Sequence, residues 1–148
     1  MTQRDNGKPA FIADDDPARL DRDWIWRMMS TEAYWHRWRR RSDVETQIDR
    51  AWRVVGIYET QEGRQVGFAR ATSDGVHDAY LADVIVEPGA RGRGIGKLLM
   101  RTMVEDGVGA AFRWTLFTAD AHGLYEQFGF AAPDSTAMVR PSTRAAAP

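Results

Sequence analysis

The chain has 148 residues, of which 43% are hydrophobic, and this length and composition fit one domain, residues 1–148, with a real core. Its 20 basic and 21 acidic side chains leave a formal net charge of −1, so no global field recruits nucleic acid or an anionic membrane. It contains no cysteine, which excludes a disulfide framework, thiolate zinc sites and a cysteine nucleophile.

The N-terminal third predicts helices that are rich in aromatic side chains. Residues 1–8 are polar and without pattern, so we expect a mobile tail and no signal peptide. A short edge strand is expected over 9–13. Asp16-Pro17 places a capping acid before a proline, which predicts a helix over 18–29. No apolar run approaches the ~20 residues of a membrane span, and a cytoplasmic protein is the default expectation.

A second short helix is expected over 31–38, and it overlaps the basic run WHRWRRR at 35–41. This run has three interpretations: a nucleic-acid patch, a solvated helix face with Trp35 and Trp38 packed inward, or a lid over an acceptor pocket. The rest of the chain is not basic, which favours the solvated face. Ser42 to Glu45 form a capping box, which predicts another helix directly after the run.

Three strands are expected in the middle of the chain. β-Branched and aromatic residues predict strands over 54–59 and 65–72, joined by a turn at Glu62-Gly63. A second turn at Asp74-Gly75 leads into a strand over 80–86. These strands would form an antiparallel meander.

Asp83 stands in the middle of this last strand among apolar residues. A buried carboxylate without a partner is costly, so Asp83 needs a partner or a task. The hairpin register about Gly75 and Val76 places Arg70 near Asp83, and an ion pair would explain both residues. Alternatively, Asp83 faces an acceptor site, where it would bind an ammonium group or relay its proton. The sequence leaves both interpretations open.

Pro88 and Gly89 end the strand, and the run RGRGIGK at 91–97 opens a helix. The first amides of a helix have no internal partner, so a glycine-rich turn at this point predicts an anion site, and pyrophosphate is the natural guest. A P-loop is excluded because Leu98 replaces the hydroxyl that would hold magnesium. A dinucleotide fingerprint is excluded because Lys97 stands where its third glycine belongs.

The C-terminal part predicts alternating helices and strands. The helix after the glycine turn should end near Asp106-Gly107, and a parallel strand should follow over 112–118. Asp120 would cap a helix over 121–128 that Gly129 ends. Two short strands, 130–132 and 136–139, and a mobile tail over 141–148 would complete the chain.

Two motifs resemble one known family. The pattern Arg-x-x-Gly-x-Gly, at Arg91, Gly94 and Gly96, is similar to the acetyl-coenzyme A loop of the GCN5-related N-acetyltransferase (GNAT) family. LYEQFGF, at 124–130, is similar to the family's LYEKFGF segment. The two matches stand in the family's order, and the resemblance covers roughly residues 54–138.

The resemblance implies a mixed α/β (α+β) GNAT fold. Its central twisted sheet would have about six to seven strands with helices on both sides, and a gap between central strands would hold coenzyme A. The implied activity is transfer of an acetyl group from acetyl-CoA to a primary amine of a small molecule, by direct attack in a ternary complex. A phenol is protonated at neutral pH, so Tyr125 is the expected general acid, and Asp83 is the candidate base.

The other expected site residues fall into two groups. The pyrophosphate and the pantetheine arm would contact the glycine turn, the end of the preceding strand and the start of the last helix: Val84, Ile85, Val86, Arg91, Gly92, Arg93, Gly94, Ile95, Gly96, Lys97 and Asp120. The acceptor would contact a second, ring-rich group: Trp24, Tyr34, Trp35, Arg70 and Tyr80.

The main alternative is a non-catalytic GNAT-fold module that binds coenzyme A or a partner protein. His36, His77 and His122 are isolated in the sequence, so no metal site is expected. The expected partner is a small-molecule amine, with neither nucleic acid nor membrane. Dimers are common among similar proteins, which makes a homodimer a candidate assembly.

Overall fold

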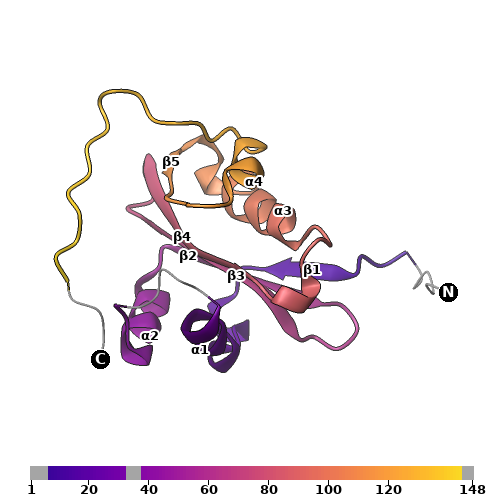
Figure 1. Cartoon of the computed structure of the whole chain (residues 1–148). Helices are drawn as coiled ribbons and strands as arrows, with labels where there is room; N and C mark the ends of the chain where they lie inside the picture. The colour runs from indigo at the N-terminus through magenta and orange to yellow at the C-terminus, as the bar shows by residue number, and fades with distance from the viewer. Residues whose placement is uncertain (1–6, 33–37, 145–148) are drawn as a thin grey trace.

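A five-stranded sheet separates two layers of helices in the computed structural model, which describes residues 7–32 and 38–144 (Figure 1). One face is covered by α1 (Arg22–Thr31) and α2 (Arg41–Arg50), and the other by α3 (Ile95–Met100) and α4 (His122–Glu126). The strands are β1 (Phe11–Asp14), β2 (Arg53–Glu59), β3 (Gln65–Ser73), β4 (Asp78–Val86) and β5 (Arg113–Thr115). None of the described helices is long and apolar enough to cross a bilayer.

The sheet has the strand order β1-β2-β3-β4-β5. β1 to β4 are antiparallel neighbours, as the expected meander requires, and β5 joins β4 in parallel after the α3 crossover. β4 and β5 pair only from Asp78–Arg113 to Tyr80–Thr115. Beyond Tyr80 the two strands separate, so the second half of β4 has a partner on one side only.

The helix boundaries follow from side-chain caps. Asp16 caps a 3-10 turn over Pro17–Arg19, as expected, by accepting from the amide of Ala18. The single helix expected over 18–29 is wrong, because Asp21 caps a separate helix, α1, through the amide of Trp24 at 2.9 Å.

Two other expected caps are also replaced. The expected capping box of Ser42 and Glu45 is wrong, because α2 has Arg40 as its N-cap and the Asp43 carboxylate accepts from the Arg40 amide at 2.8 Å. Before α4, the hydroxyl of Thr118 accepts from the amide of Ala121, so Asp120 does not cap this helix. α3 continues beyond Met100 as a π-helical turn, Arg101–Glu105.

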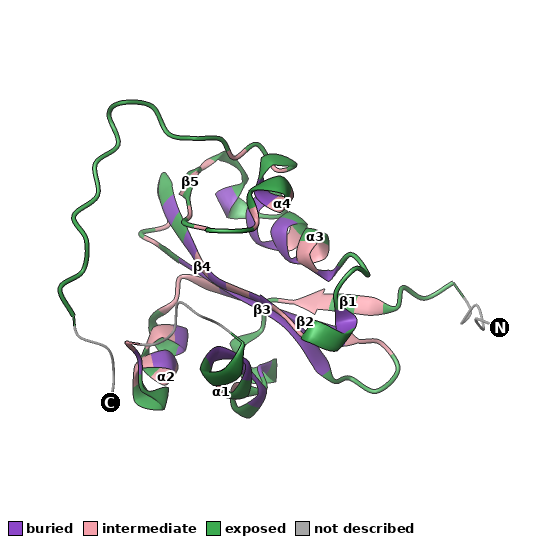
Figure 2. Cartoon of the chain, viewed as in Figure 1, coloured by how far each residue is buried: buried purple, intermediate pink, exposed green. Residues whose placement is uncertain are grey.

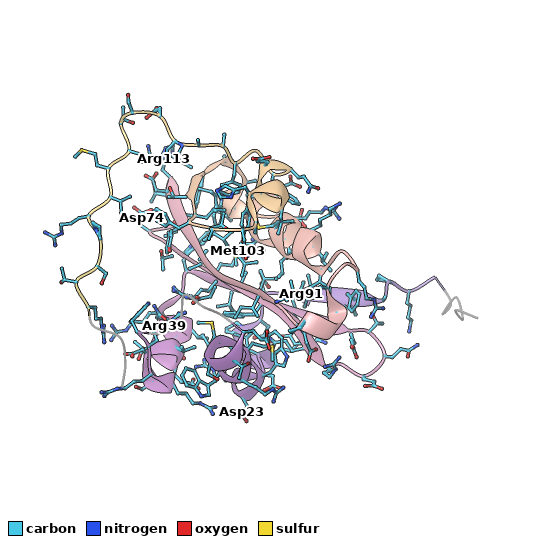
Figure 3. The ribbon with its side chains drawn as sticks, in the orientation of Figure 1. Asp23, Arg39, Asp74, Arg91, Met103 and Arg113 are labelled. Carbon is cyan, nitrogen blue, oxygen red and sulfur yellow. The ribbon has the colours of Figure 1, made fainter. Side chains whose placement is uncertain are left out.

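Apolar side chains pack on both faces of the sheet, and Figure 2 shows that much of the central strands is buried. Val55, Ile57, Leu99 and Met103 belong to the cluster under α3 and α4, and Met103 is labelled between these layers in Figure 3. Trp24, Ile25, Met29, Val54 and Phe68 belong to the cluster under α1 and α2. Neighbours such as Val54 and Val55 face opposite layers, as the period of a strand requires.

A bulge in β4 breaks this alternation. Arg70 pairs with Ala82 but Phe68 pairs with Ile85, so β4 has one residue more than β3 over this interval. Asp83 lies in the bulge with φ at +54°, the left-handed region that aspartate tolerates better than most residues. Because of the extra residue, Leu81 faces the α3 layer whereas Ile85 faces the α1 layer.

The sheet is smaller than expected at its C-terminal end. The strands expected over 130–132 and 136–139 are not formed, and the described sheet has five strands instead of six to seven. The segment that follows Phe130 is exposed, with Met138 94% accessible. β5 offers only three paired residues as an edge, and Pro133 cannot donate to a ladder. Most of the two expected tails, namely residues 1–6 and 145–148, lies outside the described residues. Within the C-terminal tail, Arg144 forms an ion pair with Asp43 at 3.6 Å.

We predict that Gly67→Ala destabilises the protein by about 1–3 kcal/mol, because it overpacks the contact between β3 and α3. A Cβ at Gly67 would lie 2.9 Å from Cγ2 of Ile95 and 3.1 Å from Cβ of Ile57. Gly89→Ala is the matched control, since a Cβ there meets nothing within 4 Å. Urea unfolding of both variants tests this prediction, and equal free energies of unfolding would contradict it.

Candidate active site

A cavity of about 570 Å³ opens where β4 and β5 separate. Its walls come from β3, β4, the segment between β5 and α4, α4 itself, and the segment before α2. The lining residues are Trp38, Arg39, Arg70, Tyr80, Leu81, Ala82, Asp83, Val84, Phe117, Thr118, Ala119, Asp120, Ala121 and Tyr125. Six residues expected from the sequence, among them both candidate catalytic residues, are therefore brought together at one place: Arg70, Tyr80, Asp83, Val84, Asp120 and Tyr125.

Asp83 is the centre of a buried ion cluster at the floor of this cavity. Arg39 donates to both carboxylate oxygens of Asp83, from Nη1 at 2.7 Å and from Nη2 at 2.9 Å. Arg70 donates from Nε to Oδ2 of Asp83 at 2.6 Å, so the ion pair expected from the hairpin register is confirmed. The three residues are 3%, 7% and 8% exposed, in the order Arg39, Arg70, Asp83.

This environment makes Asp83 a weak base. Burial by itself raises the pKa of Asp83, but hydrogen bonds and charge from Arg39 and Arg70 outweigh it, so the pKa lies below its ordinary value. A proton on this carboxylate would break charge-assisted bonds to two buried guanidinium groups. The geometry therefore favours the ion-pair interpretation of Asp83 over the proton-relay interpretation.

Arg39 is the site residue that sequence reasoning missed. Within the run at 35–41, residues 35–37 lie outside the described part of the chain, Trp38 is half-buried, and Arg41 pairs with Asp23 and Glu45. The expected solvated face is wrong for Arg39, which Figure 3 labels beside α2 and which is buried against Asp83 of β4. Nothing near it in the sequence indicates this, because its partner lies 44 residues away.

Two tyrosines from different elements face the cavity. Tyr125, on α4, is 9% exposed and packs edge-on against Phe130 with ring centroids 6.1 Å apart. Tyr80, on β4, lies 6.0 Å from the ring of Phe117. Burial raises the pKa of the Tyr80 phenol above its ordinary value, which keeps this hydroxyl protonated and able to donate.

The glycine turn lies beyond the end of β4, where Figure 3 labels Arg91. Gly92 and Gly94 have φ of +79° and +84°, and a Cβ at either position would meet nothing within 4 Å. The backbone of the turn is thus open to a ligand. The first intrahelical bond of α3 runs from Leu98 to the Gly94 carbonyl at 3.0 Å, which leaves the three amides before Leu98 without a helical partner.

The expected acceptor rings are only partly located. Trp24 is 1% exposed and belongs to the core under α1 and α2, not to the cavity lining. Tyr34 and Trp35 lie outside the described residues. Within 7–32 and 38–144 no group of histidine and acidic residues could hold a metal ion, and His36 lies outside these ranges.

We predict that Asp83→Asn lowers the free energy of unfolding at pH 7 by roughly 3–5 kcal/mol, because it leaves two buried arginines without their counterion. Since the folded pKa of Asp83 lies below its unfolded value, the carboxylate stabilises the fold fully above about pH 3.9. Its contribution is lost as the pH falls through the folded pKa, so wild type and variant should converge in acid.

Asp49→Asn is the control for this prediction, because Asp49 makes an exposed ion pair with Arg22 and should cost no more than about 1 kcal/mol. Urea unfolding of the three proteins between pH 7 and pH 3 is the measurement. An Asp83→Asn variant as stable as Asp49→Asn at pH 7 would contradict the structural role of the cluster.

Comparison with known proteins assigns this chain to a family. A family model described as the acetyltransferase (GNAT) domain matches residues 51–132, more than half of the chain. Serotonin N-acetyltransferase 2, chloroplastic, of Oryza sativa subsp. japonica is 41% identical over 71 residues, which cover 47% of this chain and 36% of that protein. Histone acetyltransferase TAP1 of Glycine max is 40% identical over 83 residues, which cover 52% and 34%. The chain spans about a third of the length of these curated relatives.

Solved structures agree over nearly the whole chain. A crystal structure assigned to the GNAT family, from Xanthomonas campestris pv. campestris, has a TM-score of 0.83 and 36% identity, covering 92% of this chain and 96% of that one. A GNAT-family acetyltransferase from Streptococcus pneumoniae TIGR4 shares the fold, with a TM-score of 0.71 at 19% identity, covering 90% and 98%. The chain therefore belongs to the GNAT family of acetyltransferases.

Proposed function

We propose that this protein transfers an acetyl group from acetyl-CoA to the primary amine of a small molecule, by direct attack in a ternary complex. One observation carries the proposal: β4 leads from an open glycine turn at one end to a cavity lined by Tyr125 at its unpaired edge. A turn that would bind phosphate and a tyrosine that would donate a proton thus lie near the two ends of one stretch of β4, which suits an elongated thioester such as acetyl-CoA.

The residues of the turn fit a pyrophosphate. Gly92 and Gly94 let the backbone approach it, the amides of Ile95, Gly96 and Lys97 point toward it, and Arg91 supplies positive charge. Arg93 stacks on the ring of Phe11, with its guanidinium carbon 4.7 Å from the ring centroid. Ile95 is buried and anchors the turn to the core.

The edge of β4 that faces away from β3 would bind the pantetheine arm. The Glu87 amide donates to the Val66 carbonyl at 2.9 Å, so alternation along the strand turns the amides of Val86 and Val84 toward the gap. An amide there would polarise the thioester carbonyl, as a donor in an oxyanion hole does. Ile85 contributes by packing, since its side chain belongs to the core under α1 and α2.

The proposed chemistry begins from the free amine, which forms when the ammonium releases one proton to a base. The neutral amine nitrogen attacks the carbonyl carbon of the thioester, the carbon–sulfur bond breaks, and Tyr125 donates its proton to the leaving thiolate. The nitrogen releases a second proton as the amide forms, and this proton restores the Tyr125 hydroxyl through solvent. Of the two carboxylates in the described lining, Asp83 is held by two arginines, whereas Asp120 makes no hydrogen bond or ion pair with a described residue. We therefore assign the base role to Asp120, directly or through water, and a positioning role to Asp83.

The alternative is a GNAT-fold module that binds coenzyme A without turnover. The enclosed tyrosine and the free carboxylate in the cavity favour catalysis, because a binding module needs neither. Among the relatives, one name refers to serotonin and another to a histone, so names alone leave small-molecule and protein amines open. The cavity volume of about 570 Å³ suits a small molecule.

We predict that Tyr125→Phe lowers the rate of thiol release from acetyl-CoA by a factor on the order of 10²–10⁴, because it removes one proton donor and keeps the ring. The affinity for coenzyme A, measured by calorimetry, should stay near wild type. The assay uses a panel of primary amines under conditions in which the chemical step limits the rate.

Tyr58→Phe is the matched control, because Tyr58 is 2% exposed, lies outside the cavity lining, and its buried hydroxyl has no hydrogen-bond partner among the described residues. This variant should keep wild-type turnover. Full turnover by Tyr125→Phe would remove Tyr125 from the mechanism. If the wild type binds coenzyme A but releases no thiol from acetyl-CoA with any of the amines, the non-catalytic alternative is favoured.

A further inference from the structure

Arg70 carries more hydrogen-bond donors than its partners use. Its Nε donates to Asp83, but its terminal nitrogens, Nη1 and Nη2, have no hydrogen-bond partner within the described part of the chain. The side chain is 9% accessible, and the residue lines the cavity. A largely buried guanidinium with four unused N–H groups on the wall of an open cavity can bind an additional acceptor from a ligand.

The charge of the buried cluster supports the same conclusion. Arg39 and Arg70 place two positive charges against the single negative charge of Asp83, and Arg39 already uses both terminal nitrogens on Asp83 and Gln47. One positive charge is therefore left over, and Arg70 is the residue that presents it to the cavity. A buried surplus charge is costly unless an opposite charge arrives.

The neighbours of Arg70 complete a site for a planar oxyanion beside an apolar group. Tyr80 lines the same cavity with a phenol that burial keeps protonated, so it adds a neutral donor. Phe117 and Trp38 supply ring surface. Asp120, from the segment between β5 and α4, adds a negative charge to a different wall of the cavity.

We propose that the acceptor of this enzyme is an amine that also carries a carboxylate, as an amino acid does, with Arg70 binding the carboxylate through its terminal nitrogens. The inference rests on the proposed acetyltransferase function and names its substrate class. Asp120 faces the ammonium end before transfer, which matches the polarity of a zwitterion. A polyamine without a carboxylate would place a cation against the surplus positive charge of Arg70.

A carboxylate could also enter this site on the acyl donor, as in succinyl-CoA. The shared chemistry is a carboxylate against the guanidinium of Arg70. We place it on the acceptor because Arg70 lies with Tyr80 and Phe117, toward the β5 end of the cavity, whereas the pyrophosphate turn lies beyond the opposite end of β4.

Pairs of amines that differ only in the carboxylate test the proposal: lysine against cadaverine, ornithine against putrescine, and tryptophan against tryptamine. The wild type should favour the carboxylate member of at least one pair by roughly 10- to 100-fold in kcat/KM, the size of a charge-assisted hydrogen bond. Arg70→Gln should reduce that preference to near one. Arg113→Gln, an exposed arginine paired with Asp78, should keep it.

Arg70→Lys serves as a second variant if Arg70→Gln does not fold. It retains the positive charge but loses the paired donors of the guanidinium, so its preference for the carboxylate amine should be intermediate. A wild type that turns over amines while favouring the decarboxylated member of every pair overturns the inference but leaves the acetyltransferase function standing. The same variants are also assayed with succinyl-CoA as the donor. If Arg70→Gln no longer uses succinyl-CoA but keeps the preference for the carboxylate amine, the inference is overturned, because the carboxylate then belongs to the donor. Absence of turnover with any amine contradicts the acetyltransferase function itself.

Discussion

The buried ion cluster of Asp83, Arg39 and Arg70 is the constraint on which the site depends. It ties together three segments: the chain before α2, strand β3, and the bulge of β4. Asp83 adopts a left-handed backbone conformation that costs free energy for a residue with a side chain, and two arginines hold it there. The bulge reverses the faces of β4, so that Ile85 packs under α1 while the other side of the strand lines the gap.

The gap between β4 and β5 lies beside this bulge, and the proposed function depends on it. β4 pairs with β5 over three residues and then continues with one edge free, between a turn that can hold a pyrophosphate and a cavity that holds Tyr125. In the proposed function, the donor, the proton source and the acceptor would therefore be arranged along a single strand. The same cluster that fixes the bulge also leaves a surplus positive charge at the cavity, so under the inference above Arg70 would serve both the structure and the choice of substrate.

The parts of this site that the sequence predicts are those encoded locally. Gly92 and Gly94 are needed for positive φ within a few residues of each other, and Tyr125 stands in a short contiguous segment, so both can be recognised from the sequence alone. The pairing of Arg70 with Asp83 was accessible through hairpin register. The role of Arg39 could not be predicted, because its partner lies 44 residues away and the basic residues around it indicate a solvated helix face. The missing C-terminal strands show the same limit: an alternating pattern forms a strand only where a sheet edge is available to pair with it.

The central claim is that β4 aligns the donor between the glycine turn and Tyr125, and a crystal structure with bound coenzyme A tests it most directly. The account predicts a pyrophosphate at the amides that follow Gly94, a pantetheine arm along the free edge of β4 from Val86 to Val84, and the sulfur within hydrogen-bond reach of the Tyr125 hydroxyl. Coenzyme A bound away from β4, or a sulfur remote from Tyr125, would contradict it.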